Sequence, residues 1–258
     1  MASTSKLRNV SAVESELEKS ARAHRILEME GQGDMTLGHM SVRDPEGRGF
    51  WLKRKAIGLG QVLGPSDFTL LDFDGNKLAG DGEVHNEWPI HSEILLRRPD
   101  INAIGHTHPF YGCVFSAADE ELRAVALEGG YFHPTVPRYS ASYDLINTKH
   151  LGVGVAEALG DTSFALFLKN HGVVFCGKST EHATLMAIFL EKACRAQLVI
   201  KSSGVSWSWP DDEAMKSRGP QTFHQGLIDR SWRFYSEKLD WLMGSRDNEK
   251  AKGEFFAR

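Results

Sequence analysis

Short apolar runs of strand length alternate with longer amphipathic stretches of helical period from residue 11 to about residue 203, and this alternation constrains the fold more than any other feature. No linker rich in proline, glycine or serine interrupts the series. Because interleaved strands and helices form a sheet covered by helices, the pattern predicts one α/β domain over residues 1–204. After Gly204 the alternation of apolar runs stops and aromatic residues become frequent. Residues 205–258 are therefore interpreted as an aromatic-rich C-terminal appendage that packs at a subunit interface.

The expected elements follow from turn residues, prolines and apolar periodicity. Helices are expected at 11–31, 89–98, 109–118, 143–160 and 179–204. Strands are expected at 38–43, 49–54 and 101–108, and strand pairs joined by tight turns at 68–80 and 163–177.

Charge and cysteine content exclude several classes of protein. The net charge of -4 gives no electrostatic basis for binding nucleic acid or an anionic membrane surface. The three cysteines are far apart with no Cys-x-x-Cys pair, so neither a disulfide framework nor a structural zinc knuckle is expected. The first twenty residues carry no apolar signal segment, and no stretch approaches about 18 uninterrupted apolar residues. These features lead us to expect a cytoplasmic protein.

Two histidines, His106 and His108, stand at the end of the apolar run in "INAIGHTHPF". Residues i and i+2 of a strand point to the same face, so the two imidazoles can bind one ion from one side. Imidazole suits zinc, iron, manganese or cobalt better than calcium or magnesium. The pair alone is weak evidence, because two polar residues at a half-exposed strand end would look the same.

A third histidine and a carboxylate strengthen the metal hypothesis. His171 follows an apolar strand in "LFLKNHGVVFCG", where the turn before Gly172 has no evident structural need for an imidazole. Three imidazoles with open coordination positions are a known catalytic design. Glu87 lies just before a predicted helix N-terminus and is the candidate acid/base. Glu93, six residues later, is interpreted as a solvated helix residue.

The segments "GHMSVR", "HNEWPIHSEILLRRPDINAIGHTHP" and "LFLKNHGVVFCG" together resemble the class II aldolase/adducin family over roughly residues 20 to 200. The resemblance implies one divalent metal ion per subunit (Mn, Zn, Co or Fe) held by His106, His108 and His171, with Glu87 as the catalytic acid/base. It also implies a three-layer α/β/α sandwich around a largely antiparallel sheet. Family members commonly form homo-oligomers, above all tetramers of four-fold symmetry.

The sequence departs from the pattern with which sugar-phosphate members of the family bind phosphate. Those members use small hydroxyl and amide residues in three loops, which read here Leu37-Gly38-His39, "AIGLGQ" and His85-Asn86. The lack of these hydroxyl residues argues against a phosphorylated sugar as the substrate. The sequence of the three loops resembles the decarboxylase branch of the family instead. The implied function is a metal-dependent carbon–carbon lyase on a non-phosphorylated small-molecule carboxylate. Decarboxylation of a hydroxylated aromatic or heteroaromatic acid, through a metal-stabilised enolate, stands ahead of retro-aldol cleavage.

Candidate ligands for the substrate carboxylate are His39, His85 and Arg43, although a surface salt bridge explains Arg43 equally well. Tyr235, in the aromatic-rich appendage, is a candidate contributor to an adjoining subunit's site. His91, four residues after Glu87, is interpreted as a packing or capping residue, with catalytic contact as the alternative.

Two further functions remain open from the sequence. Some proteins that resemble this family use iron and dioxygen on aromatic 2-oxo or 2-hydroxy acids, and the same three imidazoles would serve that chemistry. A non-catalytic assembly module like adducin is the other reading. It is disfavoured because such domains tend to lose the metal ligands, all of which are present here.

Overall fold

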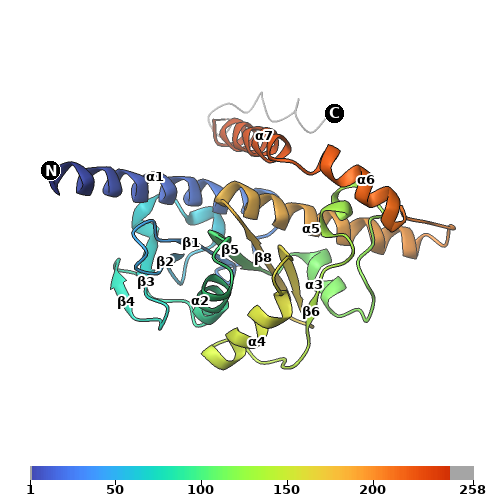
Figure 1. The fold of residues 1–258 in the computed structure, drawn as a ribbon, viewed down its shortest axis with the longest axis horizontal. Coiled ribbons are helices and arrows are strands. Elements are labelled where there is room, and N and C mark those ends of the chain that lie inside the picture. The colour runs from blue at the N-terminus through green and yellow to red at the C-terminus, as the bar shows by residue number, and fades with distance from the viewer. Residues whose placement is uncertain (1, 245–258) are drawn as a thin grey trace.

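In the computed structural model, which describes residues 2–244, the strands form one eight-stranded sheet with helices on both faces (Figure 1). The strand order is β4-β3-β2-β1-β5-β8-β7-β6, and every neighbouring pair is antiparallel except β6 with β7. The strand bounds are β1 His39–Arg43, β2 Phe50–Lys53, β3 Phe68–Leu71, β4 Lys77–Ala79, β5 Ala103–Thr107, β6 Arg138–Tyr139, β7 Ala165–Leu168 and β8 Gly172–Gly177.

Helices α1 (Ala2–Met29), α3 (Phe110–Ser116) and α5 (Thr180–Ser202) pack on one face of the sheet. Helices α2 (Trp88–Arg97) and α4 (Lys149–Leu159) cover the other face. Three short 3-10 helices lie in the connections, at Leu59–Gln61, Pro65–Asp67 and Leu127–Phe132. The predicted three-layer α/β/α sandwich around a largely antiparallel sheet is therefore confirmed.

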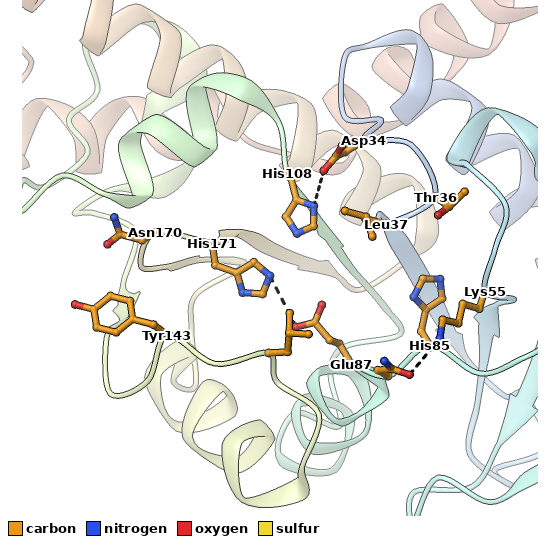
Figure 2. Close-up of a pocket in the computed structure, with 12 residues that line it drawn as sticks. Asp34, Thr36, Leu37, Lys55, His85, Glu87, His108, Tyr143, Asn170 and His171 are labelled. Carbon is orange, nitrogen blue, oxygen red and sulfur yellow. Dashed lines mark hydrogen bonds and ion pairs between the residues drawn. The ribbon is translucent and has the colours of Figure 1, made fainter.

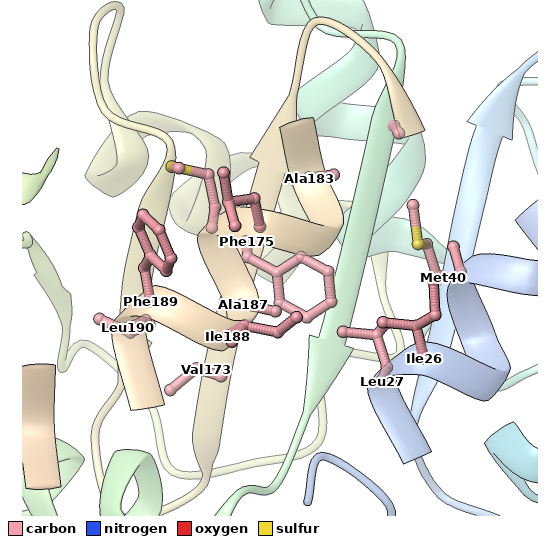
Figure 3. Packing of buried hydrophobic residues seen from close by; sticks show 14 of the residues in the cluster. Ile26, Leu27, Met40, Val173, Phe175, Ala183, Ala187, Ile188, Phe189 and Leu190 are labelled. Carbon is pink, nitrogen blue, oxygen red and sulfur yellow. The ribbon is translucent and has the colours of Figure 1, made fainter. Parts of the chain in front are cut away.

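Alternation along the strands divides the core into two clusters. In β8, Val173 and Phe175 join the cluster under α1 and α5, whereas Val174 and Cys176 join the cluster under α2 and α4. This is the period of two expected of a strand that is covered on both faces. Figure 3 shows Phe175 and Val173 beside the α5 side chains. On the same face of the sheet, Met40 of β1 lies against α1. The strands at the centre of the sheet are thus fixed by packing on both sides.

Two predicted helix starts differ from the structure. The first helix extends from Ala2 rather than from residue 11. The helix expected at 143–160 begins only at Lys149, because the Thr148 side chain accepts a hydrogen bond from the Leu151 backbone and caps the helix there. Residues 143–147 form an irregular loop instead, and this loop reaches the candidate active site described below.

The C-terminal segment contributes α6 (Asp212–Thr222) and α7 (Gln225–Gly244), and α7 lies outside the α1 and α5 layer (Figure 1). Ile228, Tyr235 and Leu239 of α7 are buried against α1 and α5 within the same chain. The last part of the predicted appendage, residues 245–258, lies outside the described residues. Across the part of the chain that the structure describes, none of the helices combines the length and apolarity needed to cross a membrane.

Candidate metal centre and active site

His106 lies at the centre of the sheet, on β5, where it is directly opposite His39 of β1 and Val174 of β8. Its side chain is fully buried, and its Nδ1 donates to the backbone carbonyl of Val173 at 2.9 Å. A neutral imidazole has one N–H, so this hydrogen bond leaves Nε2 with a free lone pair. Burial lowers the pKa of His106 well below its usual range, which keeps this lone pair available.

His108 follows the end of β5 and is oriented by a carboxylate. Its Nδ1 donates to Oδ2 of Asp34 at 3.1 Å, which again leaves Nε2 as the free nitrogen. Asp34 lies in the loop after α1, and that loop is tied to β5 because Thr107 donates to the buried Gln32 side chain at 2.8 Å. Metal-binding histidines are typically oriented in this way by a carboxylate or carbonyl on the second ring nitrogen.

His171 is placed by the tight turn between β7 and β8. Asn170 adopts a left-handed conformation with φ of 59°, which asparagine tolerates better than most residues. Gly172 is required by space, since a Cβ there would lie 2.6 Å from Cδ2 of His108. The Asn-His-Gly sequence thus allows β8 to approach β5 closely enough to bring the third imidazole to the other two. Burial lowers the pKa of His171 to about 4.

The three imidazoles provide a group of nitrogen ligands of the kind that binds a transition-metal ion. One ligand nitrogen from each of His106, His108 and His171 lies within 4.8 Å of the others. The Nε2 atoms of His106 and His108 are only 3.0 Å apart, and both carry lone pairs because both Nδ1 atoms are donors. Two lone pairs at that distance repel each other, and a shared cation removes the repulsion. The residues therefore fit a bound metal ion.

Glu87 faces this cluster from the N-cap position of α2. Its Oε2 lies 3.6 Å from Nε2 of His106, and its Oε1 lies 3.9 Å from Nε2 of His171. The backbone N–H of Ile146 donates to Oε1 at 3.0 Å, from the loop that replaces the first turns of the helix predicted at 143–160. Burial raises the pKa of Glu87. A carboxyl group with a raised pKa beside three imidazoles suits proton transfer.

A pocket of about 510 Å³ opens onto the cluster (Figure 2). In this view His108, His171 and Tyr143 lie to one side of Glu87, and His85 and Lys55 lie to the other. The lining is mixed, with polar, charged and apolar members: Asp34, Thr36, Leu37, Lys55, His85, Asn86, Glu87, His108, Tyr143, Leu145, Asn170 and His171.

His85 and His39 lie next to each other beside the metal cluster. Their ring centroids are 4.4 Å apart, and the His39 ring is 5.4 Å from that of His106. His85 lines the pocket, whereas His39 is 1% exposed and lies deeper. Burial lowers the pKa of His85 to about 3. Both residues are thus near the pocket, and their contact with the substrate carboxylate stays a prediction.

The structure does not bring Arg43 to the pocket. Arg43 is at the opposite end of β1 from His39, and its guanidinium donates to the backbone carbonyls of Leu95, Arg98 and Ile101. It ties the end of α2 to the start of β5. The predicted substrate contact is replaced by a structural role for this arginine.

Tyr235 also lies outside the pocket of its own chain. It is on α7, where its hydroxyl accepts a hydrogen bond from Lys192 of α5 at 3.1 Å. Its predicted contact concerns an adjoining subunit and stays a prediction.

Sequence reasoning missed Asp34, Lys55 and Ile146. Lys55 is the one lysine or arginine among the residues that line the pocket, and its Nζ is 3.5 Å from Oδ1 of Asn86. A signal for Lys55 was present in the basic run "LKRK" beside the second of the three loops, but periodicity does not show which of those cations faces the pocket. Asp34 and Ile146 act from loops whose path follows only from the tertiary fold.

Residues 18–198 match the family described as Class II Aldolase and Adducin N-terminal domain, and the chain belongs to this family. It is 28% identical over 190 residues to Meiotically up-regulated gene 14 protein of Schizosaccharomyces pombe, covering 72% of this chain and 73% of that protein. It is 32% identical over 201 residues to 3,4-dihydroxyphthalate decarboxylase of Arthrobacter keyseri, covering 72% of this chain and 79% of that enzyme. The structure resembles L-fuculose 1-phosphate aldolase of Glaciozyma antarctica, with a TM-score of 0.79, 26% identity, and coverage of 92% and 93% of the two chains.

These comparisons confirm the predicted family and its decarboxylase-like branch. They also confirm, at the level of the family, the prediction of an enzyme of the lyase class, since decarboxylases and aldolases are among the relatives.

Proposed function

We propose that the protein is a divalent-metal-dependent lyase that decarboxylates a hydroxylated aromatic acid. The observation that carries the proposal is the pair of bare Nε2 atoms of His106 and His108, 3.0 Å apart and facing Glu87. The similarity to a decarboxylase of 3,4-dihydroxyphthalate supports this substrate class over a phosphorylated sugar. In the proposal one ion of zinc, manganese, cobalt or iron is bound by His106, His108 and His171.

When bound, such an ion supplies Lewis acidity toward a hydroxyl or carbonyl oxygen of the substrate. The chain's own residues orient the imidazoles for this purpose, through Val173 on His106 and Asp34 on His108. Fixed donors lose little entropy on binding and hold the ion in one position against the pocket.

Glu87 is proposed to protonate the ring carbon that loses carbon dioxide. Because burial raises its pKa, Glu87 stays protonated at a higher pH than an exposed glutamate does. The Ile146 N–H holds Oε1, so that Oε2 is the oxygen free to exchange a proton near His106. Because the carboxyl group is largely buried, this proton is shielded from solvent.

Lys55 is proposed to bind the substrate carboxylate in place of Arg43, with His85 beside it. Lys55 and His85 lie across Glu87 from His171 in the pocket (Figure 2). A substrate held between the imidazole cluster and Lys55 would therefore place its reacting carbon near Glu87. His39, immediately behind His85, is proposed to complete this polar side of the pocket.

We also propose that the protein is a homo-oligomer, with a tetramer as the expected form. Three apolar or aromatic residues of the pocket lining, Leu37, Tyr143 and Leu145, are 46%, 68% and 53% exposed in the single chain. Exposed apolar groups around a pocket mouth are typical of a surface that another subunit covers. Light scattering of the purified protein tests the subunit number, and a monomer at micromolar concentration would contradict this proposal.

The function is tested by elemental analysis of protein purified without added metal, combined with a panel of hydroxylated benzoates and phthalates. Carbon dioxide release and oxygen uptake are followed in the same vessel. One manganese, cobalt or zinc ion per subunit with carbon dioxide release and no oxygen uptake is the expected result. Iron with substrate-dependent oxygen uptake would favour the oxygenase alternative, and retro-aldol cleavage would release an aldehyde or ketone instead. Protein without any bound metal would contradict the proposal.

A further inference from the structure

A chain of buried polar side chains runs behind the metal cluster and ends at its edge. Ser41 Oγ lies 2.7 Å from Nδ1 of His91, and Nε2 of His91 lies 2.7 Å from Nδ1 of His39. All three residues are at most 1% exposed. The His39 ring in turn packs against His85 and against the metal-ligand candidate His106.

The fold explains how these residues meet. His39 and Ser41 are two apart on β1, so both side chains point to the face of the sheet that α2 covers. His91 is four residues after Glu87, and four residues make about one helical turn. The hydrogen bonds of His91 therefore tie the first turn of α2, and with it Glu87, to the strand that pairs with the His106 strand.

Packing alone does not account for an imidazole at position 91. The ring stacks on Phe50 with a centroid distance of 6.1 Å, beside the apolar cluster that lies under α2 and α4. Burying polar nitrogens in such a layer is unfavourable unless each of them is hydrogen-bonded. Both nitrogens of His91 are bonded, and the unpartnered nitrogens of this group are Nε2 of His39 and Nε2 of His85, at the pocket end.

The two hydrogen bonds allow only two arrangements of the protons. If Ser41 donates to His91, then His91 donates from Nε2 and His39 is left with an N–H at its own Nε2. If His39 donates from Nδ1, then His91 donates from its Nδ1 to Ser41 and the His39 Nε2 is a bare acceptor. The proton position on His91 thus decides whether Nε2 of His39, at the pocket end of this chain of side chains, is a donor or an acceptor.

We propose that His91 is a positioning residue for the decarboxylation site. It fixes the orientation and tautomer of His39, which supports His85 in the pocket, and it anchors the helix turn that carries Glu87. The substrate class in this inference rests on the proposed function, whereas the tautomer of His39 does not.

The test replaces the two nitrogens of His91 separately. His91→Gln places an amide near the position of Nε2 and can keep the bond to His39, whereas His91→Asn places it near Nδ1 and can keep only the bond to Ser41. His91→Phe keeps the aromatic shape against Phe50 without either hydrogen bond. His182→Phe is the matched control, because His182 is a largely buried imidazole packed on Phe164 at the start of α5, away from the pocket lining.

Metal content, kcat, KM and the Kd for 3,4-dihydroxybenzoate by calorimetry are measured for each metal-loaded variant. We expect His91→Phe and His91→Asn to lose about 10- to 100-fold in kcat with full metal content, the range of a lost orienting contact. His91→Gln should lie within about threefold of the parent, and His182→Phe should match the parent. A kcat and Kd within twofold of the parent in His91→Phe, or a glutamine variant no better than asparagine, would overturn the inference. If the phenylalanine variant does not fold, the comparison of glutamine with asparagine decides.

A readout that does not depend on turnover separates this inference from the proposed function. Long-range 1H–15N spectra of the metal-free protein assign the protonated nitrogen of each histidine. One tautomer of His39 is expected in the parent and in His91→Gln, and a mixture in His91→Phe. An unchanged single tautomer in His91→Phe would contradict the positioning role even if decarboxylation were established. The expected shift would support that role even if the panel of benzoates gave no turnover.

Discussion

Oδ2 of Asp34 lies 3.1 Å from Nδ1 of His108, and this contact turns Nε2 of the imidazole toward the other two histidines. The Asp34 carboxylate is about one-third exposed and lies on the pocket wall, where it pairs with the His108 imidazole. In the proposed metal site it would therefore act on the bound ion through the orientation and basicity of His108.

Replacing Asp34 with alanine should weaken metal binding by about 10- to 100-fold, the usual effect of losing a partner that orients a ligand. The dissociation constant for zinc, measured by competition with a chromophoric chelator, checks this prediction. Asp81→Ala removes an exposed carboxylate outside the pocket lining and should leave the constant unchanged. Equal affinities for the two variants would argue against a role for Asp34.

His108→Ala should abolish bound metal and activity while leaving the fold intact. The His108 side chain is 14% exposed and is not part of the two buried clusters, so its loss removes a ligand without opening a core cavity. Elemental analysis and circular dichroism are the measurements. Retention of a full equivalent of metal with full activity would refute the assignment of the metal site.

Glu87→Gln should retain the metal and lose about 10²- to 10⁴-fold in kcat, because an amide cannot exchange the proton that general acid catalysis requires. The amide can still accept the hydrogen bond from Ile146, so the loop at 143–147 should stay in place. Metal content and kcat are measured together. A parallel fall in metal occupancy would instead show that Glu87 is a ligand.

Local rules placed the three histidines near one another, and the family resemblance joined them into one predicted metal site; the structure does bring the three imidazoles together. The spacing of two in a strand places His106 and His108 on one face, and the turn residues around His171 mark where the next strand begins. Arg43 shows where such rules end. It shares a face of β1 with His39, but four residues of extended chain separate the two by about 13 Å. The arginine therefore reaches the opposite end of the sheet.

The loops could not be predicted in the same way. The stretch at 143–147 continues the apolar spacing of the helix after it, yet Thr148 caps that helix and the free Ile146 N–H binds Glu87. That contact joins residues 59 positions apart, and local periodicity carries no information about it.

Lys55→Met should raise KM for the carboxylate substrate by about tenfold or more with a smaller change in kcat. A charge-assisted hydrogen bond contributes about 1.5–3 kcal/mol, and about 1.4 kcal/mol corresponds to a factor of ten in binding. Methionine keeps most of the aliphatic stem and removes the charge. Lys77→Met, on exposed strand β4, is the matched control. Steady-state kinetics with an unchanged KM for Lys55→Met would assign the carboxylate to another residue.

His24 should make the protein less stable in mild acid. The imidazole is fully buried on α1, its Nδ1 donates to the carbonyl of Ser20 at 2.7 Å, and burial lowers its pKa from 6.5 to about 3. The unfolded chain binds a proton below pH 6.5 that the folded chain does not bind until about pH 3. Stability is therefore complete above pH 6.5 and falls by about 1.4 kcal/mol per pH unit as the pH drops through this window.

Replacing His24 with glutamine, which does not titrate, should flatten the pH dependence of the unfolding free energy by that amount per unit. Urea unfolding at pH 4.5, 5.5, 6.5 and 7.5 measures the slope, whatever the absolute stability of the variant at neutral pH. His150→Gln, at an exposed position on α4, serves as the control and should keep the parent slope. Parallel curves for the parent and His24→Gln would mean that the buried imidazole does not govern acid sensitivity. The loss of stability at low pH would then have to come from other buried groups such as His39, His85 and His91, whose pKa values burial also lowers.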